Sequence, residues 1–380
     1  MKVVFLQELL PSYRVEFLRQ LGRKVDLTVI YGGADGRADG FDVPDHATLP
    51  DEATWIMLES RRASLGGKSV TWLSGLTERI AAIRPDVVIA VGNKHLIQNH
   101  LLIAARRRRG YRLYFIQHAR HYTARAKILD RAEQFYHREY LCRFSDGLIL
   151  YTAAERHELV QEGFSEAKVS YCQNTLDTAR IQRTVRDLSP EEIAGTCAEY
   201  GVAERPSMAV IGRLVAGKNV DQAIDYHETL QRRVPELQTV IIGDGPQRAA
   251  LEARAGGVRG VRCTGRIFDP RVFACLLRRC RFVLSPGYVG LNVVHAFAHA
   301  KPFVAFRSLE NKPEVSYLSH GHNGLLLDRE RLAENEDVLA RLLTDEPWLA
   351  ELSRGAAATA QALTVEHMAD LVYATLMRTA

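Results

Sequence analysis

Short apolar runs rich in β-branched and aliphatic residues alternate along this chain with longer stretches in which apolar residues recur at helical spacing. The first runs are KVVFLQ (2–7), VDLTVIY (25–31), DVVIAVG (86–92), YRLYFIQH (111–118), GLILY (147–151) and KVSYCQN (168–174). Between them, helical patterns cover residues 13–21, 72–83, 96–109, 124–144 and 153–162. Strands that alternate with helices of this length are typical of parallel, doubly wound α/β sheets.

The same alternation starts again at residue 207, after a charged stretch in which the pattern weakens. Apolar runs recur at 207–212, 237–243, 261–265, 281–285, 302–306 and 324–328. We therefore predict an N-terminal domain over residues 1–178, a linker over 179–205 and a C-terminal domain over 206–360. A final helix within 361–380 has one apolar stripe, and it could pack on either domain, including by crossing back to the N-terminal one. Two such sheets in tandem predict a cleft between the carboxyl ends of their strands, where ligands bind.

The composition fits this interpretation. A length of 380 residues favours two hydrophobic cores, and 47% hydrophobic with 25% charged residues is typical of soluble globular proteins. No apolar run approaches the roughly 20 residues of a membrane-spanning helix. The opening MKVVFLQELL predicts a first strand rather than a signal peptide. The six cysteines form no CxxC pair, which favours reduced thiols and a cytoplasmic protein.

Positive charge is concentrated in one region of the N-terminal half. Residues 101–140 contain ten Lys or Arg residues against three acids, whereas the whole chain has a net charge of +5. Such a region could attract phosphates, an anionic membrane surface or nucleic acid. The alternative is an ordinary solvated helix face. Few aromatic residues are interleaved with the arginines, so nucleic acid is the least favoured partner.

Three segments of the second half each follow a predicted strand and should therefore meet at one edge of the sheet. In IGRLVAGKN (211–219), Arg213 and Lys218 place two cations beside a helix start, an arrangement that suits a diphosphate. In IIGDGPQ (241–247), glycines on both sides of Asp244 expose the main chain. In LSPGYVGLNVVHAFAHAKPFV (284–304), the amides of residues 289–292 should face a ligand. The alternative for Arg213 and Lys218 is a role as surface charges.

Other phosphate and metal motifs are absent from the sequence. GGKS (66–69) is similar to the end of a P-loop, but Arg62 occupies the position of its first glycine. No GxGxxG follows a strand, no Asp-x-Asp pair is placed for magnesium, and there is no HExxH. We therefore expect no metal and no organic cofactor, and we expect Arg213 and Lys218 to neutralise a leaving diphosphate.

GRLVAGKN (212–219), the GDGP turn (243–246) and the strand–Pro–turn–Gly–helix segment that ends in PFV together resemble the C-terminal half of retaining glycosyltransferases of family 4. The resemblance covers about 207–330 and is looser in the N-terminal half. It implies a GT-B fold, in which two Rossmann-like doubly wound domains face each other across a cleft, with a nucleotide-sugar donor on the C-terminal domain and no obligatory metal. The implied donor-binding residues are Gly212, Arg213, Lys218, Gly243, Asp244, Gly245, Pro286, Gly287, Tyr288, Val289, Gly290, Leu291, Asn292, His295 and Glu314.

The chain departs from the family signature of two glutamates with seven residues between them. Gly287 and His295 occupy those positions. The second glutamate would bind the ribose hydroxyls in the family, and His295 can still form a hydrogen bond there. The pattern PGxVGL…H resembles a variant subgroup among polysaccharide-assembly transferases. Glu314, in NKPEV, resembles the Pro-Glu of a family loop near the donor.

The resemblance also suggests roles in the N-terminal half. LPSYRVEFLRQL (10–21) and the segment HARH (118–121) are similar to the family's opening and acceptor-side loops. We expect Tyr13, Arg14, His118 and His121 to bind the acceptor. His118, Arg213 and Lys218 are the predicted catalytic residues, with a purely structural histidine as the alternative for His118.

The predicted activity is therefore retaining transfer of a sugar from a UDP- or GDP-sugar to a glycan or lipid-linked acceptor, in the assembly of cell-surface polysaccharide or glycoconjugate. Arg106, Arg107, Arg108 and Arg109 are the predicted contact with an anionic membrane surface, on the inner face of the plasma membrane. Two alternatives remain open. One is another GT-B enzyme that uses nucleotide sugars, such as an epimerase. The other is a catalytically inactive partner subunit that binds the donor.

Overall fold

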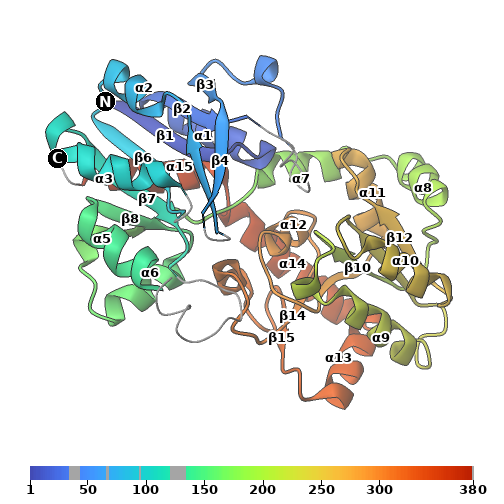
Figure 1. The fold of residues 1–380 in the computed structure, drawn as a ribbon. Coiled ribbons are helices and arrows are strands. Elements are labelled where there is room, and N and C mark those ends of the chain that lie inside the picture. The colour runs from blue at the N-terminus through green and yellow to red at the C-terminus, as the bar shows by residue number, and fades with distance from the viewer. Residues whose placement is uncertain (34–42, 66–67, 94–95, 120–133, 379–380) are drawn as a thin grey trace. The chain divides into compact units, whose positions relative to one another are not determined.

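The computed structural model describes residues 1–33, 43–65, 68–93, 96–119 and 134–378. The chain forms two compact units, each built on a parallel sheet covered by helices (Figure 1). The first unit contains Met1–Leu176 and Val365–Ala380, and the second contains Asp177–Thr364. The prediction of two doubly wound α/β domains is confirmed.

The first unit has a seven-stranded sheet in the order β3-β2-β1-β6-β7-β8-β9. All neighbouring strands in it are parallel. Its central strands are apolar and buried along their length, as expected when helices cover both faces of a sheet. The strands are β1 (Lys2–Leu9), β2 (Asp26–Gly32), β3 (Thr54–Leu58), β6 (Val87–Val91), β7 (Arg112–Gln117), β8 (Gly147–Leu150) and β9 (Val169–Tyr171).

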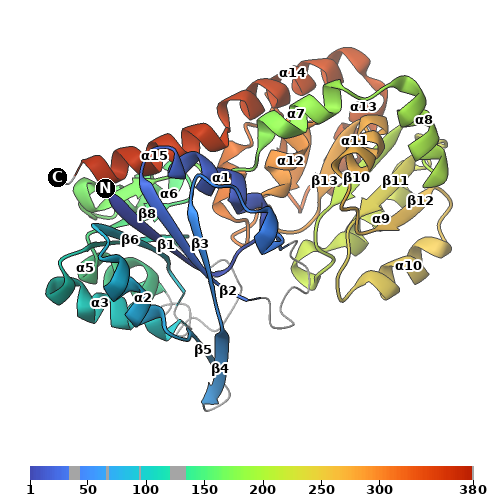
Figure 2. The ribbon, with the colours of Figure 1, turned by 90° about the horizontal axis from the view of Figure 1, so that it is seen from above.

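Helices lie on both faces of the first sheet. On one face, α1 (Ser12–Gly22) and α15 (Val365–Met377) pack together, side by side in Figure 2, and share one apolar core with the sheet. The second core lies on the opposite face, beneath α2 (Leu76–Ile83), α3 (Ile97–Arg109), α5 (Leu141–Phe144) and α6 (Ala153–Gln161). The final helix thus belongs to the first unit.

The hairpin β4 (Ser60–Leu65) and β5 (Lys68–Leu73) was not predicted, and it extends beyond the sheet in Figure 2. The predicted helix at 72–83 was wrong in its first residues, because β5 continues to Leu73. The apolar pair Trp72 and Leu73 fits a strand as well as a helix, and Gly75, with φ of 76°, separates the two elements. The predicted helix at 124–144 lies partly outside the described residues. Its remaining part forms a π-helical turn, η2 (Phe135–Tyr140), followed by α5.

The second unit has a six-stranded parallel sheet in the order β12-β11-β10-β13-β14-β15. The chain proceeds outward from β10 in one direction, then returns and proceeds outward from β13 in the other. Ligands bind in doubly wound sheets at this reversal, outside the carboxyl ends of the strands. The strands are β10 (Ser207–Ile211), β11 (Gln238–Ile242), β12 (Val261–Gly265), β13 (Phe282–Ser285), β14 (Phe303–Phe306) and β15 (Gly324–Leu327), close to the predicted runs.

The helices of the second unit also form two layers. On one face, α9 (Val220–Leu230), α10 (Arg248–Gly256) and α13 (Leu332–Thr344) close a core with the sheet. On the other face, α11 (Pro270–Arg279) and α12 (Asn292–Ala298) pack against α7 (Thr178–Arg186), α8 (Pro190–Glu199) and α14 (Glu346–Ala362). The segment 179–205, predicted as a linker, therefore forms helices of this unit.

Candidate functional site

The candidate donor site lies at the carboxyl edge of the second sheet, where β10 and β13 are neighbours. Gly212 and Arg213 directly follow β10, and Pro286 and Gly287 directly follow β13. The turn after β11, with Gly243, adjoins them. The three predicted loops therefore meet at the reversal point of the sheet.

Hydrogen bonds join the first two loops. The amide of Leu214 donates to the carbonyl of Asp244 at 2.9 Å, and the amide of Gln247 donates to the carbonyl of Leu214 at 3.1 Å. A Cβ on Gly243 would lie 1.9 Å from the carbonyl oxygen of Gly212, so this approach requires glycine. Asp244 uses one carboxylate oxygen within its own turn, where it accepts from the amide of Gly245 at 2.8 Å.

The third loop packs directly on the first. The amide of Tyr288 donates to the carbonyl of Gly217 at 3.1 Å. A Cβ on Gly287 would lie 2.1 Å from that same carbonyl oxygen and 2.4 Å from the Cα of Lys218. The turn that carries Lys218, η4 (Ala216–Lys218), thus occupies space that any side chain at position 287 would need.

Lys218 is held against Tyr288. Its ammonium donates to the carbonyl of Tyr288 at 2.7 Å and lies 4.1 Å from the centroid of the Tyr288 ring. Burial is the main cause that lowers the pKa of Lys218 to about 8; the carboxylate of Glu314 opposes this shift, and the nearby ammonium of Lys312 adds to it. Arg213 is exposed. Burial raises the pKa of the Tyr288 phenol, and the positive charge of Arg213 opposes that rise. Lys218 thus lies against the Tyr288 ring, the charge of Arg213 acts on that phenol, and the charge of Glu314 acts on Lys218.

The amides predicted to face a ligand are partly occupied. Val289 donates its amide to the side-chain oxygen of Asn311 at 2.9 Å, and Gly290 donates to that of Asn292 at 2.9 Å. Among the described residues, the amide of Leu291 has no acceptor. The Asn292 side chain also donates to the hydroxyl of Ser285 at 3.3 Å. In this structure the loop satisfies much of its own main chain.

His295 lies in α12 and packs against aromatic rings. Its ring is 5.5 Å from that of Phe273 on α11 and 6.3 Å from that of His299. Burial lowers its pKa to about 4, so the imidazole is neutral near pH 7. Its Nδ1 is excluded from solvent and has no hydrogen-bond partner among the described residues. The ring therefore retains a nitrogen that can bond to a ligand.

Three residues near this site were missed in the sequence. Asn311 holds the third loop through Val289, and Lys312 places a second ammonium 5.5 Å from the Tyr288 ring. Arg329 donates from its guanidinium to the carbonyl of Pro286 and to the side chain of Gln222. Asn311 and Lys312 belong to the same NKPEV segment that indicated Glu314 and could have been included. No sequence signal indicated Arg329.

The predicted acceptor residues lie in the first unit. Arg14 is in the first turn of α1, and its guanidinium donates to the Tyr151 hydroxyl at 3.3 Å. His118 directly follows β7, and its ring meets that of Tyr151 edge-on at 4.4 Å. The guanidinium carbon of Arg14 also lies 5.7 Å from the centroid of the Tyr13 ring. These three predicted residues are therefore close together, while His121 lies outside the described residues.

Sequence reasoning missed the groups that connect this site. Tyr151 follows β8 and contacts both Arg14 and His118. The buried carboxylate of Glu155 accepts from the amides of Ala119, at 2.7 Å, and Tyr151, at 3.2 Å. It thereby ties the ends of two neighbouring strands together. The signal for Tyr151 was present, because it is the last residue of the predicted strand 147–151 and His118 ends the predicted strand 111–118.

The four arginines predicted to contact a membrane surface differ in their surroundings. Arg106 forms an ion pair with Asp146, at 3.2 Å, whereas Arg107, Arg108 and Arg109 are exposed at the end of α3. Among the residues that the structure describes, none of the helices has the length and apolar character needed to cross a membrane. Nor do these residues contain a group of three or more His, Cys, Asp or Glu side chains placed to hold a metal ion.

Parts of this chain are similar to known proteins. Residues 205–345 match the family described as "Glycosyl transferases group 1". Alpha-D-kanosaminyltransferase of Streptomyces kanamyceticus is 30% identical over 158 residues, which are 40% of this chain and 40% of that protein. The GDP-mannose-dependent alpha-(1-6)-phosphatidylinositol monomannoside mannosyltransferase of Mycobacterium tuberculosis is 26% identical over 223 residues, 55% of this chain and 56% of that enzyme. The matched region thus spans about half the length of these relatives, or less.

A solved structure extends the likeness to the whole chain. Anabaena HepE, in complex with UDP and glucose, has a TM-score of 0.72 and 17% sequence identity, and the match covers 99% of both chains. At this identity the likeness shows the fold, which is the GT-B fold of glycosyltransferases. The match to the glycosyl transferases group 1 family lies within the second unit, in the region where the sequence resembles glycosyltransferases.

Proposed function

We propose that this protein is a retaining glycosyltransferase that transfers a sugar from a UDP- or GDP-sugar to a glycan or lipid-linked acceptor, in polysaccharide or glycoconjugate assembly. The observation that carries the proposal is the loop cluster at β10 and β13, with Lys218 and Arg213 around Tyr288. The names of similar proteins support a nucleotide-sugar donor, since one relative is GDP-mannose-dependent and HepE was solved with UDP.

In the proposed reaction, the bond between the anomeric carbon and the phosphate oxygen breaks, and the nucleoside diphosphate leaves with the electron pair. The acceptor hydroxyl bonds to the same face of the sugar, and its proton passes to the departing phosphate oxygen. Lys218 and Arg213 stabilise the charge that develops on the diphosphate, which accelerates the step because this charge is greatest in the transition state. Since the protein supplies these cations, the proposal includes no metal or organic cofactor.

The proposal assigns the acceptor to the first unit. Tyr13, Arg14 and His118 converge there at the carboxyl ends of β1 and β7, the edge at which such sheets bind ligands. His118 orients the acceptor hydroxyl or polarises the sugar. The Glu155 carboxylate, which binds the amides of Ala119 and Tyr151, fixes the main chain around this histidine.

The proposal also includes peripheral contact with an anionic membrane surface. Arg107, Arg108 and Arg109 are exposed at one end of α3, and the same helix exposes the side chains of Ile97 and Leu101 by 41% and 47%. An anionic lipid surface attracts exposed cations, and it accepts exposed apolar side chains of the kind that the first half of α3 presents.

Nucleotide binding tests the donor site directly. UDP and GDP are titrated calorimetrically into the wild type, Lys218→Ala and Arg213→Ala, with Arg232→Ala, an exposed arginine of the same unit, as the control. We expect one nucleotide to bind and its Kd to rise at least tenfold in the two site variants, about 1.4 kcal/mol or more. No binding to the wild type, or unchanged affinity in both site variants, would overturn the proposal.

Transfer assays then test the chemistry. With the nucleotide sugar that binds and a panel of glycan and lipid-linked acceptors, product formation should continue in EDTA and should retain the anomeric configuration. Loss of activity in EDTA that magnesium or manganese restores would contradict the metal-independent step. Interconversion of the nucleotide sugar without acceptor would favour an epimerase, and binding without turnover would favour an inactive subunit.

A further inference from the structure

The start of α1 lies close after the carboxyl end of β1. The N-cap is Pro11, no side chain caps the helix, and its first turn contains no acidic residue. The helix of 11 residues therefore presents uncapped amides and the positive end of its dipole at the carboxyl end of β1. A helix start of this kind is common, and it indicates a ligand only in combination with other evidence.

The second observation is the Arg14 side chain in that same turn. Arg14 is only 4% exposed, yet Nε and Nη1 of its guanidinium have no hydrogen-bond partner among the described residues. The groups that act on its charge are Tyr151, Tyr13, which also interacts by hydrogen bonding, and Cys172, and none of them is a carboxylate. Burying a cation without a counterion costs several kcal/mol, and unsatisfied buried donors add to that cost.

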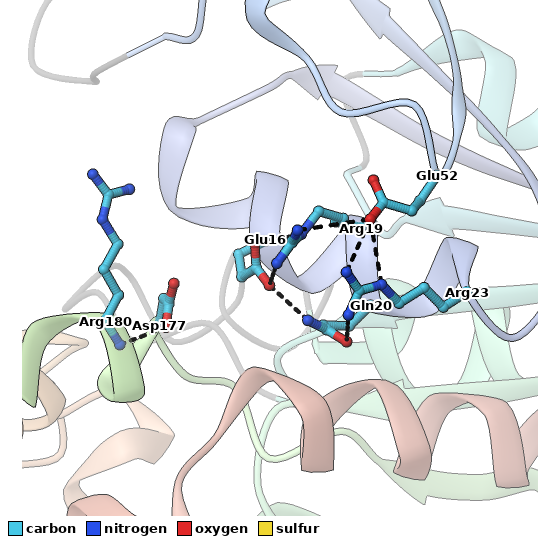
Figure 3. Close-up of polar contacts among 7 residues, drawn as sticks. All are labelled: Glu16, Arg19, Gln20, Arg23, Glu52, Asp177 and Arg180. Atoms are coloured by element: carbon cyan, nitrogen blue, oxygen red, sulfur yellow. Dashed lines mark hydrogen bonds and ion pairs between the residues drawn. The ribbon is translucent and has the colours of Figure 1, made fainter. Parts of the chain in front are cut away.

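The other arginines of α1 show what is missing at Arg14. Arg19 pairs with Glu16 at 2.8 Å, and Arg23 pairs with Glu52 at 3.0 Å (Figure 3). Both of these arginines lie on the surface, where an ion pair is least needed. Arg14, the buried one, has instead three aromatic rings within 6 Å of its guanidinium carbon, those of Tyr13, Phe17 and Tyr151.

We infer that Arg14 and the start of α1 form an oxyanion site in the first unit, which recognises a carboxylate or phosphate group carried by the acceptor. This inference rests on the proposed function. It specifies that the glycan or lipid-linked acceptor carries an acidic group. Tyr13 is the exposed ring of the three, at 37%, so the anion approaches Arg14 on that side. His118, next to Tyr151, then lies close to the same bound molecule.

Anion binding to the full chain tests the inference. The donor site is first saturated with whichever of UDP or GDP binds, and inorganic phosphate and acetate are then titrated separately. The matched variants are Arg14→Met and Arg19→Met, two arginines of one helix that differ in burial and in pairing. We expect the anion to bind the wild type and Arg19→Met equally, and Arg14→Met at least tenfold more weakly.

A nucleotide-saturated wild type that binds neither anion, or an Arg14→Met variant that binds as the wild type does, would overturn the inference. If Arg14→Met does not fold, the side-chain Nε–H signal of Arg14 in ¹⁵N-arginine-labelled wild type gives the answer. A shift of that signal on addition of phosphate or acetate supports the site, and an unchanged signal overturns it.

The two anions distinguish the sources of the acidic group. Tighter phosphate binding indicates a phosphate-bearing acceptor, and tighter acetate binding indicates an acidic sugar. In transfer assays, Arg14→Met should then lose the preference for the acidic acceptor over its neutral analogue while nucleotide affinity is unchanged. Absence of nucleotide binding in the wild type would instead contradict the proposed function, so the two failures are distinguishable.

Discussion

At the scale of single residues, the turn that carries Lys218 explains why position 287 is glycine. This turn occupies the space that a side chain at 287 would need. A side chain there would meet main-chain atoms of Gly217 and Lys218, which cannot move away independently. The glycine at 287 and the position of Lys218 therefore depend on each other.

Gly287→Ala should destabilise the second unit by about 1–3 kcal/mol, the usual effect of overpacking. It should also raise the nucleotide Kd at least tenfold, because the turn that carries Lys218 must shift. Gly256→Ala is the control, since Gly256 ends α10 of the same unit and a Cβ there meets nothing within 4 Å. Urea denaturation and calorimetry measure the two effects, and equal behaviour of the two variants would contradict this account.

Lys218 should make nucleotide affinity depend on pH. Burial lowers the pKa of Lys218 to about 8, and only the ammonium form attracts a diphosphate. As the pH rises through 8, the ammonium fraction falls, so Kd should increase by roughly tenfold between pH 7 and pH 9. Lys218→Arg stays charged in this range and should show a flat profile. A flat profile in the wild type would place Lys218 away from the phosphates.

The sequence predicted the parts of the sites that follow strands. Arg213, Lys218 and Gly243 were identified because cations and glycines directly after apolar runs must meet at one sheet edge. Arg329 could not be predicted in this way, because it reaches the Pro286 carbonyl from 43 positions further along the chain. The unsatisfied Nε and Nη1 of Arg14 were likewise beyond prediction, because they depend on which side chains surround the guanidinium.

At the scale of elements, the apolar runs predicted most strands because parallel strands are buried on both faces. The hairpin β4–β5 was not predicted, because the β4 sequence SRRASL is polar. In the described part of the chain, β4 pairs with β5 and not with the main sheet. The segment 179–205 was interpreted as a linker because its charged surface masks the helical pattern of α7 and α8. Helix α15 had the clearest apolar stripe, but a stripe does not specify its partner. The partner is α1, with Lys24 and Asp370 paired at 2.6 Å.

Met368→Ala should therefore destabilise the first unit. Met368 is 1% exposed in the core that α15 shares with the first sheet, and removal of such a side chain costs about 2–5 kcal/mol. Glu366→Ala, an exposed position on the same helix, should change the free energy of unfolding by less than about 0.5 kcal/mol. Urea denaturation measures both, and a mild effect at Met368 would show that α15 contributes little to the core.

At the scale of the whole molecule, the net charge of +5 is unevenly distributed, and the structure refines the predicted contact. Arg106 is paired with Asp146, which leaves Arg107, Arg108 and Arg109 as the exposed cations of that run. Each cation close to an anionic membrane surface contributes about 1 kcal/mol to the free energy of binding to it. Three such cations should therefore dominate the partitioning of the protein onto anionic vesicles.

The combined change of Arg107, Arg108 and Arg109 to alanine should lower partitioning onto vesicles of phosphatidylcholine with phosphatidylglycerol by roughly 100-fold, from about 1 kcal/mol per cation. Co-sedimentation measures this, with pure phosphatidylcholine vesicles and Arg232→Ala as controls. Binding of the wild type should also weaken as salt is added. If the triple variant partitions as the wild type does, the cations are an ordinary solvated helix face.

The return of the chain to the first unit has a consequence for biosynthesis. The ribosome makes Met1–Leu176 first, then all of Asp177–Thr364, and only afterwards the helix that covers α1. Until then, the core residues Phe17, Leu18 and Leu21 lack their neighbours Val365, Met368 and Val372. The nascent unit therefore exposes an apolar surface along α1. The second unit, whose residues are contiguous, can finish folding earlier. Molecular chaperones should therefore be needed mainly by the part of the chain that is translated first.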